Sequence, residues 1–338
     1  MKSVYPIKTI ALLSVCCLLI VQLSSGQVQN KNANASLKLI AFILLPDVSG
    51  RIDHLAYNSK KQLIYVAALG NNTVEVVDLK SKKVIHSIKG LDEPQGIRYI
   101  PETNVVFIAN GGNGECTVFD AETYKPVAKV KLGGDADNVR YNPATNQIFV
   151  GYSAGAIAIL DGKTYKQLAD IKLAGHPESF QLEGDSKIYV NVPDAHLLEV
   201  IDLKKNTIAE KWKIEEATAN FPMALDAVNH RLFIGCRHPA KLLVISTETG
   251  KKVASMDTNG DTDDIFYDTV TKQILMSCGD GTVDVFTQIS PDKYEAVSKI
   301  ETRSGARTAL FVPELNQIIV AAPARSGKEA QLMVYEKK

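Results

Sequence analysis

The stretch DNVRYNPATNQIFVGYSAGAIAILDGKTYKQLADIKL, residues 137–173, holds one complete copy of a pattern that runs through most of the chain. Its opening string, DNVRY, has six counterparts: DHLAY, QGIRY, ESFQL, PMALD, DDIFY and RTALF. The steps between the seven strings are 42, 42, 41, 44, 41 and 44 residues, counted between their second residues: His54, Gly96, Asn138, Ser179, Met223, Asp264 and Thr308. A nearly fixed period of this length is the sequence signature of a repeat architecture.

Each copy has the pattern of four strands. A turn such as PATN at 143–146 follows the opening string, and the run QIFVGYS at 147–153 comes next. Runs of this kind are too short and too rich in β-branched and aromatic residues for helices. The runs AIAILDG at 156–162 and QLADIKL at 167–173 complete the copy. Four strands in a repeat of this size match a propeller blade, so the sequence predicts an all-β, seven-bladed β-propeller of four-stranded antiparallel blades.

The two ends of the chain predict how the ring closes. The seventh copy stops at Lys338 after its third strand, and a lone strand pattern, LKLIAFILLPDVSG at 37–50, precedes the first copy. Pairing of this N-terminal strand with the three C-terminal strands would complete the last blade and remove the open edges of the sheet. We therefore expect a single propeller domain over residues 37–338.

Residues 1–26 have the pattern of a signal peptide. Lys2 and Lys8 precede an apolar run, TIALLSVCCLLIV at 9–21, and the small residues SSG at 24–26 follow it. The run is shorter than the ~20 residues of a membrane span, although an uncleaved N-terminal anchor stays open as an alternative. We expect cleavage after Gly26, a disordered polar leader at 27–36, and a periplasmic or secreted protein with no transmembrane domain in its mature form.

The charge balance and the cysteines limit the kinds of partner and of covalent cross-link that we expect. Without residues 1–26 the chain has 36 Lys and Arg against 38 Asp and Glu, a net charge of −2. A nucleic-acid binder usually presents a basic face, so this balance argues against a nucleic-acid partner. The three cysteines that follow residue 26, Cys116, Cys236 and Cys278, are odd in number and far apart in sequence. They predict buried free thiols rather than a disulfide framework.

The ends of the second strands carry a family resemblance. Tyr189, Val190 and Asn191 come nearest to the Tyr-Val-x-Asn motif of the YVTN-repeat β-propellers, and the string FIAN at 107–110 is close to it. The chain resembles this family over roughly residues 37–338. The resemblance implies an exported or surface propeller of undefined biochemical role. Related lactonase-like propellers share the shape, but no site motif of theirs occurs here in the same order.

Candidate site residues occupy the loop before each opening string and the first residues of that string. The first strand of each blade of a propeller lines the central channel, so residues at the start of these strands converge on one mouth of the channel. The polar residues at this position are Arg51, Asp53, His54, Gln95, Asp137, Asn138, His176, Glu178, Asp263, Asp264 and Arg307. The next position is apolar in every copy: Leu55, Ile97, Val139, Phe180, Ala224, Ile265 and Ala309.

The chemistry of this set allows several functions. The carboxylates suit a divalent metal such as Ca²⁺, Mg²⁺ or Mn²⁺, and nitrogen ligands from the histidines would also allow Zn²⁺. The candidate metal ligands are Asp53, Asp137, Glu178 and Asp263. Arg51 and Arg307 could instead hold a carboxylate or phosphate. A further interpretation is that these polar residues only fill the channel and bind no ligand.

We favour a binding or scaffold protein that holds a small molecule or a protein at the mouth, and we expect a monomer. The alternative is a metal-dependent, lactonase-like hydrolase or lyase in which His54 or His176 moves the proton. The sequence has no phosphate-binding glycine loop and no His-Glu-x-x-His motif.

Overall fold

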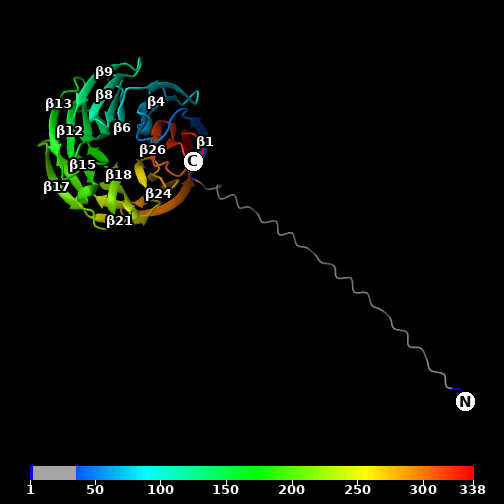
Figure 1. Cartoon of the computed structure of the whole chain (residues 1–338). Coiled ribbons are helices and arrows are strands. Elements are labelled where there is room, and N and C mark those ends of the chain that lie inside the picture. The colour runs from blue at the N-terminus through cyan, green and yellow to red at the C-terminus, as the bar shows by residue number, and fades with distance from the viewer. Residues whose placement is uncertain (3–35) are drawn as a thin grey trace. The chain divides into compact units, whose positions relative to one another are not determined.

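The described part of the chain forms seven four-stranded antiparallel sheets arranged as blades around a central axis (Figure 1). The structure is a computed structural model, and it describes residues 1–2 and 36–338. The prediction of a seven-bladed, all-β propeller is confirmed. The predicted signal peptide (1–26) and the predicted leader (27–36) fall almost entirely on residues 3–35, outside the described residues. None of the helices in the described part of the chain has the length and apolarity that crossing a membrane requires.

The strands follow the predicted order within each blade, from the channel outward. The inner strands are β2 (Leu55–Asn58), β6 (Pro94–Ile100), β10 (Ala136–Asn142), β14 (Phe180–Glu183), β18 (Thr218–Asp226), β22 (Thr262–Asp268) and β26 (Thr308–Val312). The second strands are β3 (Leu63–Ala68), β7 (Val105–Asn110), β11 (Gln147–Tyr152), β15 (Lys187–Val192), β19 (Arg231–His238), β23 (Gln273–Cys278) and β27 (Gln317–Ala322). The third strands are β4 (Thr73–Asp78), β8 (Glu115–Asp120), β12 (Ala156–Asp161), β16 (Leu197–Asp202), β20 (Ala240–Ser246), β24 (Thr282–Ser290) and β28 (Gln331–Lys337). The outer strands are β5 (Lys83–Ile88), β9 (Pro126–Lys131), β13 (Gln167–Lys172), β17 (Thr207–Lys213), β21 (Lys252–Asp257), β25 (Lys293–Glu301) and β1 (Leu37–Leu44). Three short 3₁₀ turns are η1 (Leu69–Asn71), η2 (Pro193–Ala195) and η3 (Pro313–Leu315).

The second strands are covered on both faces because each blade packs face to face against its two neighbours. All six residues of β3 are buried, and the side chains of Ile64 and Tyr65 point to opposite faces of the strand. Ile64 belongs to the core shared with the closing blade, whereas Tyr65 belongs to the core shared with blade two. This explains why these strands read as continuous apolar runs. Full burial of such a side chain contributes roughly 1.5–3 kcal/mol.

The turns between the first and second strands use asparagine where the backbone is left-handed. Asn104 and Asn146 have φ of 53° and 51°, a region that asparagine tolerates better than most residues. Each side chain also accepts a hydrogen bond from a tyrosine hydroxyl of the preceding strand, Tyr99 at 2.9 Å and Tyr141 at 3.1 Å. The repeated Tyr and Asn of the sequence therefore form one local unit that fixes the turn.

The ring closes as predicted. β1 pairs antiparallel with β28, with Leu37 opposite Lys337 and Leu44 opposite Gln331, and it is the outer strand of the blade formed by β26, β27 and β28. Ile43 of β1 is 1% exposed and lies in the core between this blade and blade one. The N-terminal strand is thus an integral part of the last blade.

Blade five corrects the predicted alignment by one residue. Met223 pairs with Ile234 in this blade, and this is the place at which Leu55 pairs with Val66 in blade one. The apolar position next to the polar column is therefore Met223, and the prediction of Ala224 was wrong. The prediction was one residue off because β18 begins at Thr218, before the apolar residues on which the alignment was based. In addition, its register with β19 shifts between Asn220 and Met223. The predicted buried thiols, Cys116, Cys236 and Cys278, are free and buried.

Candidate functional site

The mouth of the channel is built where the inner strands begin, and irregular pairing there turns polar side chains toward the axis. The register between the first and second strands shifts at this level in β6, β10, β18 and β22. In β10 the shift lies between Ala136 and Val139 and spans the neighbours Asp137 and Asn138. Regular pleating would send these two side chains to opposite faces, whereas a bulge re-aims one of them. The loop residues of blades one and four complete the mouth.

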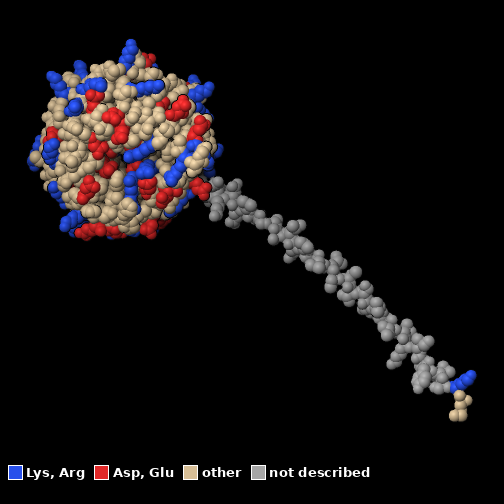
Figure 2. Space-filling model, viewed as in Figure 1, with Lys and Arg blue, Asp and Glu red and all other residues tan. Residues whose placement is uncertain are grey.

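The structure brings most of the predicted residues into one small pocket. The pocket is lined by Ser179, Phe221 and the predicted residues Arg51, Asp53, His54, Asp137, Asn138, Glu178 and Asp263. Its volume is about 10 Å³, close to the smallest space that holds one water molecule. A single ion or water fits such a space, and an organic molecule does not. Figure 2 shows acidic and basic side chains gathered around the hollow at the centre of the visible face.

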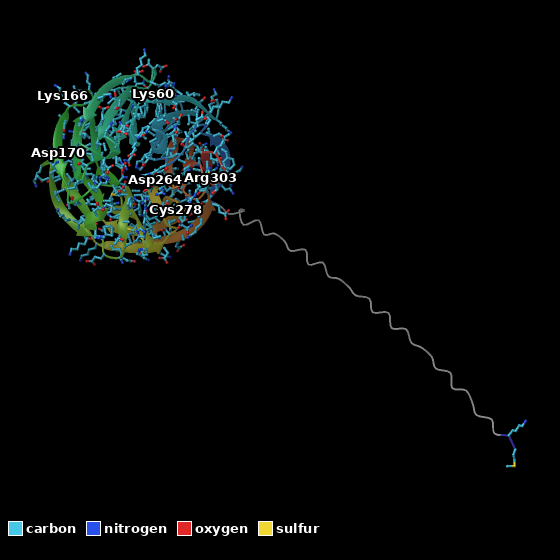
Figure 3. The ribbon with its side chains drawn as sticks, viewed as in Figure 1. Lys60, Lys166, Asp170, Asp264, Cys278 and Arg303 are labelled. Carbon is cyan, nitrogen blue, oxygen red and sulfur yellow. The ribbon has the colours of Figure 1, made fainter. Side chains whose placement is uncertain are left out.

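His54 lies at the centre of this cluster. Its Nε2 atom is 3.7 Å from Asp53 Oδ1 and 3.8 Å from Asp137 Oδ1, and its Nδ1 atom is 3.5 Å from Asp264 Oδ1. Asn138 Nδ2 lies 3.4 Å from the same Nε2 atom. Burial opposes a charged imidazole, but the neighbouring carboxylates outweigh it and raise the pKa of His54 to about 10. Figure 3 labels Asp264 near the centre of the ring, while Lys166 and Asp170 lie on its outer rim.

The carboxylates of the pocket are short of positive charge. Burial and the charge of Asp53 raise the pKa of Asp137 to about 8. Burial and the charge of Asp263 raise the pKa of Glu178 to about 7. Burial also raises the pKa of Asp263 to about 6, although the guanidinium of Arg237 acts in the opposite direction. Arg51, which donates to Asp53 Oδ2 at 2.7 Å, is half exposed and does not compensate for the rest.

Sequence reasoning missed Arg237 and Phe221. The guanidinium of Arg237 lies 3.8 Å from the centre of the Phe221 ring and pairs with Asp263. Phe221 takes the place in blade five that Asp53 takes in blade one, once the register is corrected. A signal existed: the second strand of blade five ends in IGCR, and at the place of Arg237 the other six blades carry no charged residue.

Three predicted residues lie beside the pocket. Arg307 joins the cluster from blade seven, with NH1 3.0 Å from Asp261 Oδ1 and Nε 3.8 Å from Asp263 Oδ2. Gln95 and His176 instead gather around Asp135, with Gln95 Nε2 3.2 Å and His176 Nδ1 3.6 Å from its carboxylate oxygens. Neither Gln95 nor His176 lines the small pocket.

A group of three residues has the spacing of a metal site. Asp53, His54 and Asp137 each offer one ligand atom, and these atoms lie within 4.8 Å of one another. Asp137 Oδ1 is buried and makes no hydrogen bond, so it is free to accept a ligand. Of the four predicted metal ligands, Asp53 and Asp137 belong to this group, and Glu178 and Asp263 line the pocket beside it.

The fold is shared with proteins of unrelated sequence. No family model matches the chain, and no curated protein matches it. A solved structure titled Kuenenia stuttgartiensis Hydrazine Synthase matches with a TM-score of 0.74 and 14% identity, over 85% of this chain and 96% of that one. A chain of the solved structure Crystal Structure of Mitotic Checkpoint Complex matches with a TM-score of 0.76 and 13% identity, over 96% of this chain and 99% of that one. The protein is a seven-bladed β-propeller, and at this identity the likeness carries the fold alone.

Proposed function

We propose that the protein is an exported binding propeller whose channel mouth holds a divalent cation through Asp53, His54 and Asp137. The observation that supports it most directly is the buried Asp137 Oδ1 atom, which has no hydrogen-bond partner and faces the other two ligand atoms. A buried acceptor without a partner costs about 1–3 kcal/mol, and a cation would remove that cost. The proposal also includes the YVTN-type family, on the resemblance of residues 37–338.

Size and charge favour an ion over an organic ligand. The pocket has room for one small species, and the carboxylates around it have pKa values raised by burial and mutual repulsion. A divalent cation would relieve this repulsion, whereas a carboxylate or phosphate ligand would add to it. One imidazole nitrogen with two carboxylate oxygens favours Mn²⁺ or Zn²⁺ over Ca²⁺ or Mg²⁺, which prefer oxygen ligands alone.

Thermal melting after EDTA treatment, with each cation then added separately, tests the cation site. A cation at 100 times its Kd should stabilise the protein by about 2.7 kcal/mol, and this shift should disappear in Asp137→Asn. Asp135→Asn is the matched control, because Asp135 lies at the same mouth with an exposed carboxylate and outside the group of three. If no cation shifts the melting curve, the protonated His54 is itself the cation of the cluster, and the proposed metal site is wrong.

A second candidate is the metal-dependent hydrolase. The hydrolase is favoured because the mouth adjoins a larger cavity. His54 and Asp264 belong to the cluster of charged residues at the mouth and also line that cavity. Glu178, with a pKa of about 7, is suited to proton transfer near neutral pH. Screening of lactones and esters tests it: turnover that is lost in Glu178→Gln while the cation still binds supports the enzyme. Absence of metal-dependent turnover leaves the binding protein.

Export is part of the proposal and has its own test. The pattern of residues 1–26 predicts removal of the segment during secretion. The mass of the protein isolated from its native source should match a chain that begins at Gln27. A protein that retains Met1 and stays with the membrane fraction would support the uncleaved anchor instead.

A further inference from the structure

Behind the mouth, the channel widens into a cavity that the inner strands of all seven blades line. Its volume is about 400 Å³, within the range of small-molecule sites. His54 and Asp264 lie at the boundary, because they belong to the mouth cluster and also line the cavity. The cavity therefore offers the space for an organic ligand that the mouth pocket does not have.

Two arginines enter this cavity from neighbouring blades, Arg98 from β6 and Arg140 from β10. Arg140 donates to Val139 O at 3.0 Å and to Ser179 Oγ at 3.2 Å. Within residues 36–338, neither guanidinium forms an ion pair, and the side chain of Arg98 makes no hydrogen bond. Since each guanidinium has five N–H donors, most of these donors are available to a ligand.

The charges of the two arginines are poorly compensated. Burial and the charge of Arg98 lower the pKa of Arg140 to about 10. Burial also lowers the pKa of Arg98, although the charge of Glu102 acts in the opposite direction and the residue is exposed to water. The carboxylate that lines the cavity, Asp264, is engaged by His54 and by the Ala309 N–H at 2.9 Å. An anion beside the arginines would supply the missing negative charge.

Another part of the cavity wall is apolar. Phe266 comes from blade six, and Leu310 and Phe311 come from blade seven. The ring centres of Phe266 and Phe311 lie 6.4 Å apart, close enough to form one continuous apolar surface. A cavity with both cationic and apolar parts fits a ligand with an anionic head and an apolar body.

We propose that this cavity is a second site, which binds a small organic anion with its carboxylate or phosphate head on Arg98 and Arg140 and its apolar body against Phe266, Leu310 and Phe311. Paired N–H donors of a guanidinium match the paired oxygens of both head groups. The site is separate from the cation proposed at the mouth, and binding of the anion does not require that cation.

Calorimetric titration of the full-length protein tests the site with three probes that share a naphthalene ring. The probes are 2-naphthoate, 2-naphthyl phosphate and the neutral 2-naphthamide. We expect naphthoate or naphthyl phosphate to bind and to lose roughly 10- to 100-fold in affinity in Arg98→Met and in Arg140→Met. The tighter of the two anions identifies the preferred head group. Arg325→Met is the matched control, because it removes an exposed guanidinium from the loop between β27 and β28.

The outcomes separate this site from the mouth. Binding that persists after EDTA treatment supports an anion site independent of the metal, so the two proposals can fail separately. Naphthamide that binds as tightly as the anions, equal affinity in Arg98→Met and the unaltered protein, or no anion binding at millimolar concentration would each overturn the proposal. If Arg140→Met does not fold because it loses two hydrogen bonds, Arg98→Met still decides the question.

Discussion

A buried ion pair between the last two blades provides a sharp test of how the ring is held together. Lys337, near the C-terminal end of β28, pairs with Asp268, at the end of β22, and its ammonium donates to Thr271 Oγ1 at 2.7 Å. The side chains of the pair are 1% and 8% exposed. The ammonium also lies 5.3 Å from the centre of the Phe311 ring. The pair thus joins blade six to the blade that contains both ends of the ring.

The structure sets different costs for the two partners. Asp268→Asn leaves a fully buried ammonium without its counter-charge, and breaking a buried pair in this way costs about 3–5 kcal/mol. Lys337→Met should cost less, because Asp268 keeps the hydrogen bonds from Val270 N at 2.9 Å and Thr271 Oγ1 at 2.8 Å. The double variant should be more stable than Asp268→Asn alone, since it removes the buried charge as well.

Urea unfolding of the three variants measures these differences, and an exposed pair supplies the control. Lys129 and Glu115 lie 2.6 Å apart on blade two with 59% and 28% of their side chains exposed. Lys129→Met should change the free energy of unfolding by no more than about 1 kcal/mol. If Asp268→Asn costs no more than this control, the pair is solvated in solution and the account of the closing blade is wrong.

Three further predictions concern closure, the mouth and pH. Ile43→Ala should lower the free energy of unfolding by about 2–5 kcal/mol. Phe42→Ala, on the exposed face of the same strand, should change it by about 0.5 kcal/mol or less. Equal effects of the two substitutions in urea unfolding would contradict the closing role of β1. Gly96→Ala would place a Cβ atom 1.6 Å from the Asp137 carbonyl oxygen, so it should destabilise the protein in thermal melting and weaken any binding at the mouth. Gly134→Ala is the control, because a Cβ atom there meets no atom within 4 Å. Burial works against ionised Asp268, but Lys337 and Thr271 outweigh it and hold the pKa of Asp268 below its ordinary value. The stability gap between the unaltered protein and Asp268→Asn should therefore stay constant above pH about 4 and shrink as the pH falls further; a gap that persists at pH 2 to 3 would show that charge is not its cause.

The repeat made the fold predictable because the same physical constraint recurs in each blade. A second strand such as β3 is buried on both faces, so every copy needs the same run of apolar residues, and Asn104 and Asn146 are needed where the turn backbone is left-handed. Closure was predictable for a related reason. Three strands at one end and one at the other leave edges that only their pairing can satisfy.

The candidate site was only partly predictable. The polar column predicted that Asp53, His54 and Asp137 would share one mouth, because the start of each inner strand lies at the same level of the ring. It did not predict which side chains meet, since bulges in four inner strands decide that and have no signature in this sequence. Arg237 was not predicted because it lies on a second strand, β19, outside the polar column at the start of the inner strands.

The two proposed sites follow from how the levels of the inner strands differ. The position of Leu55, Ile97 and Val139 belongs both to the cores between the blades and to the cavity wall, and every copy has an apolar residue there, as blade five has Met223. The residues before and after this position differ from blade to blade. The residues before it include the carboxylates of the mouth, and the residues directly after it include Arg98 and Arg140 in two blades and Phe266 and Leu310 in two others. The character of each site is therefore decided by the side chains that individual blades carry at these positions, and the propeller fold alone does not determine it.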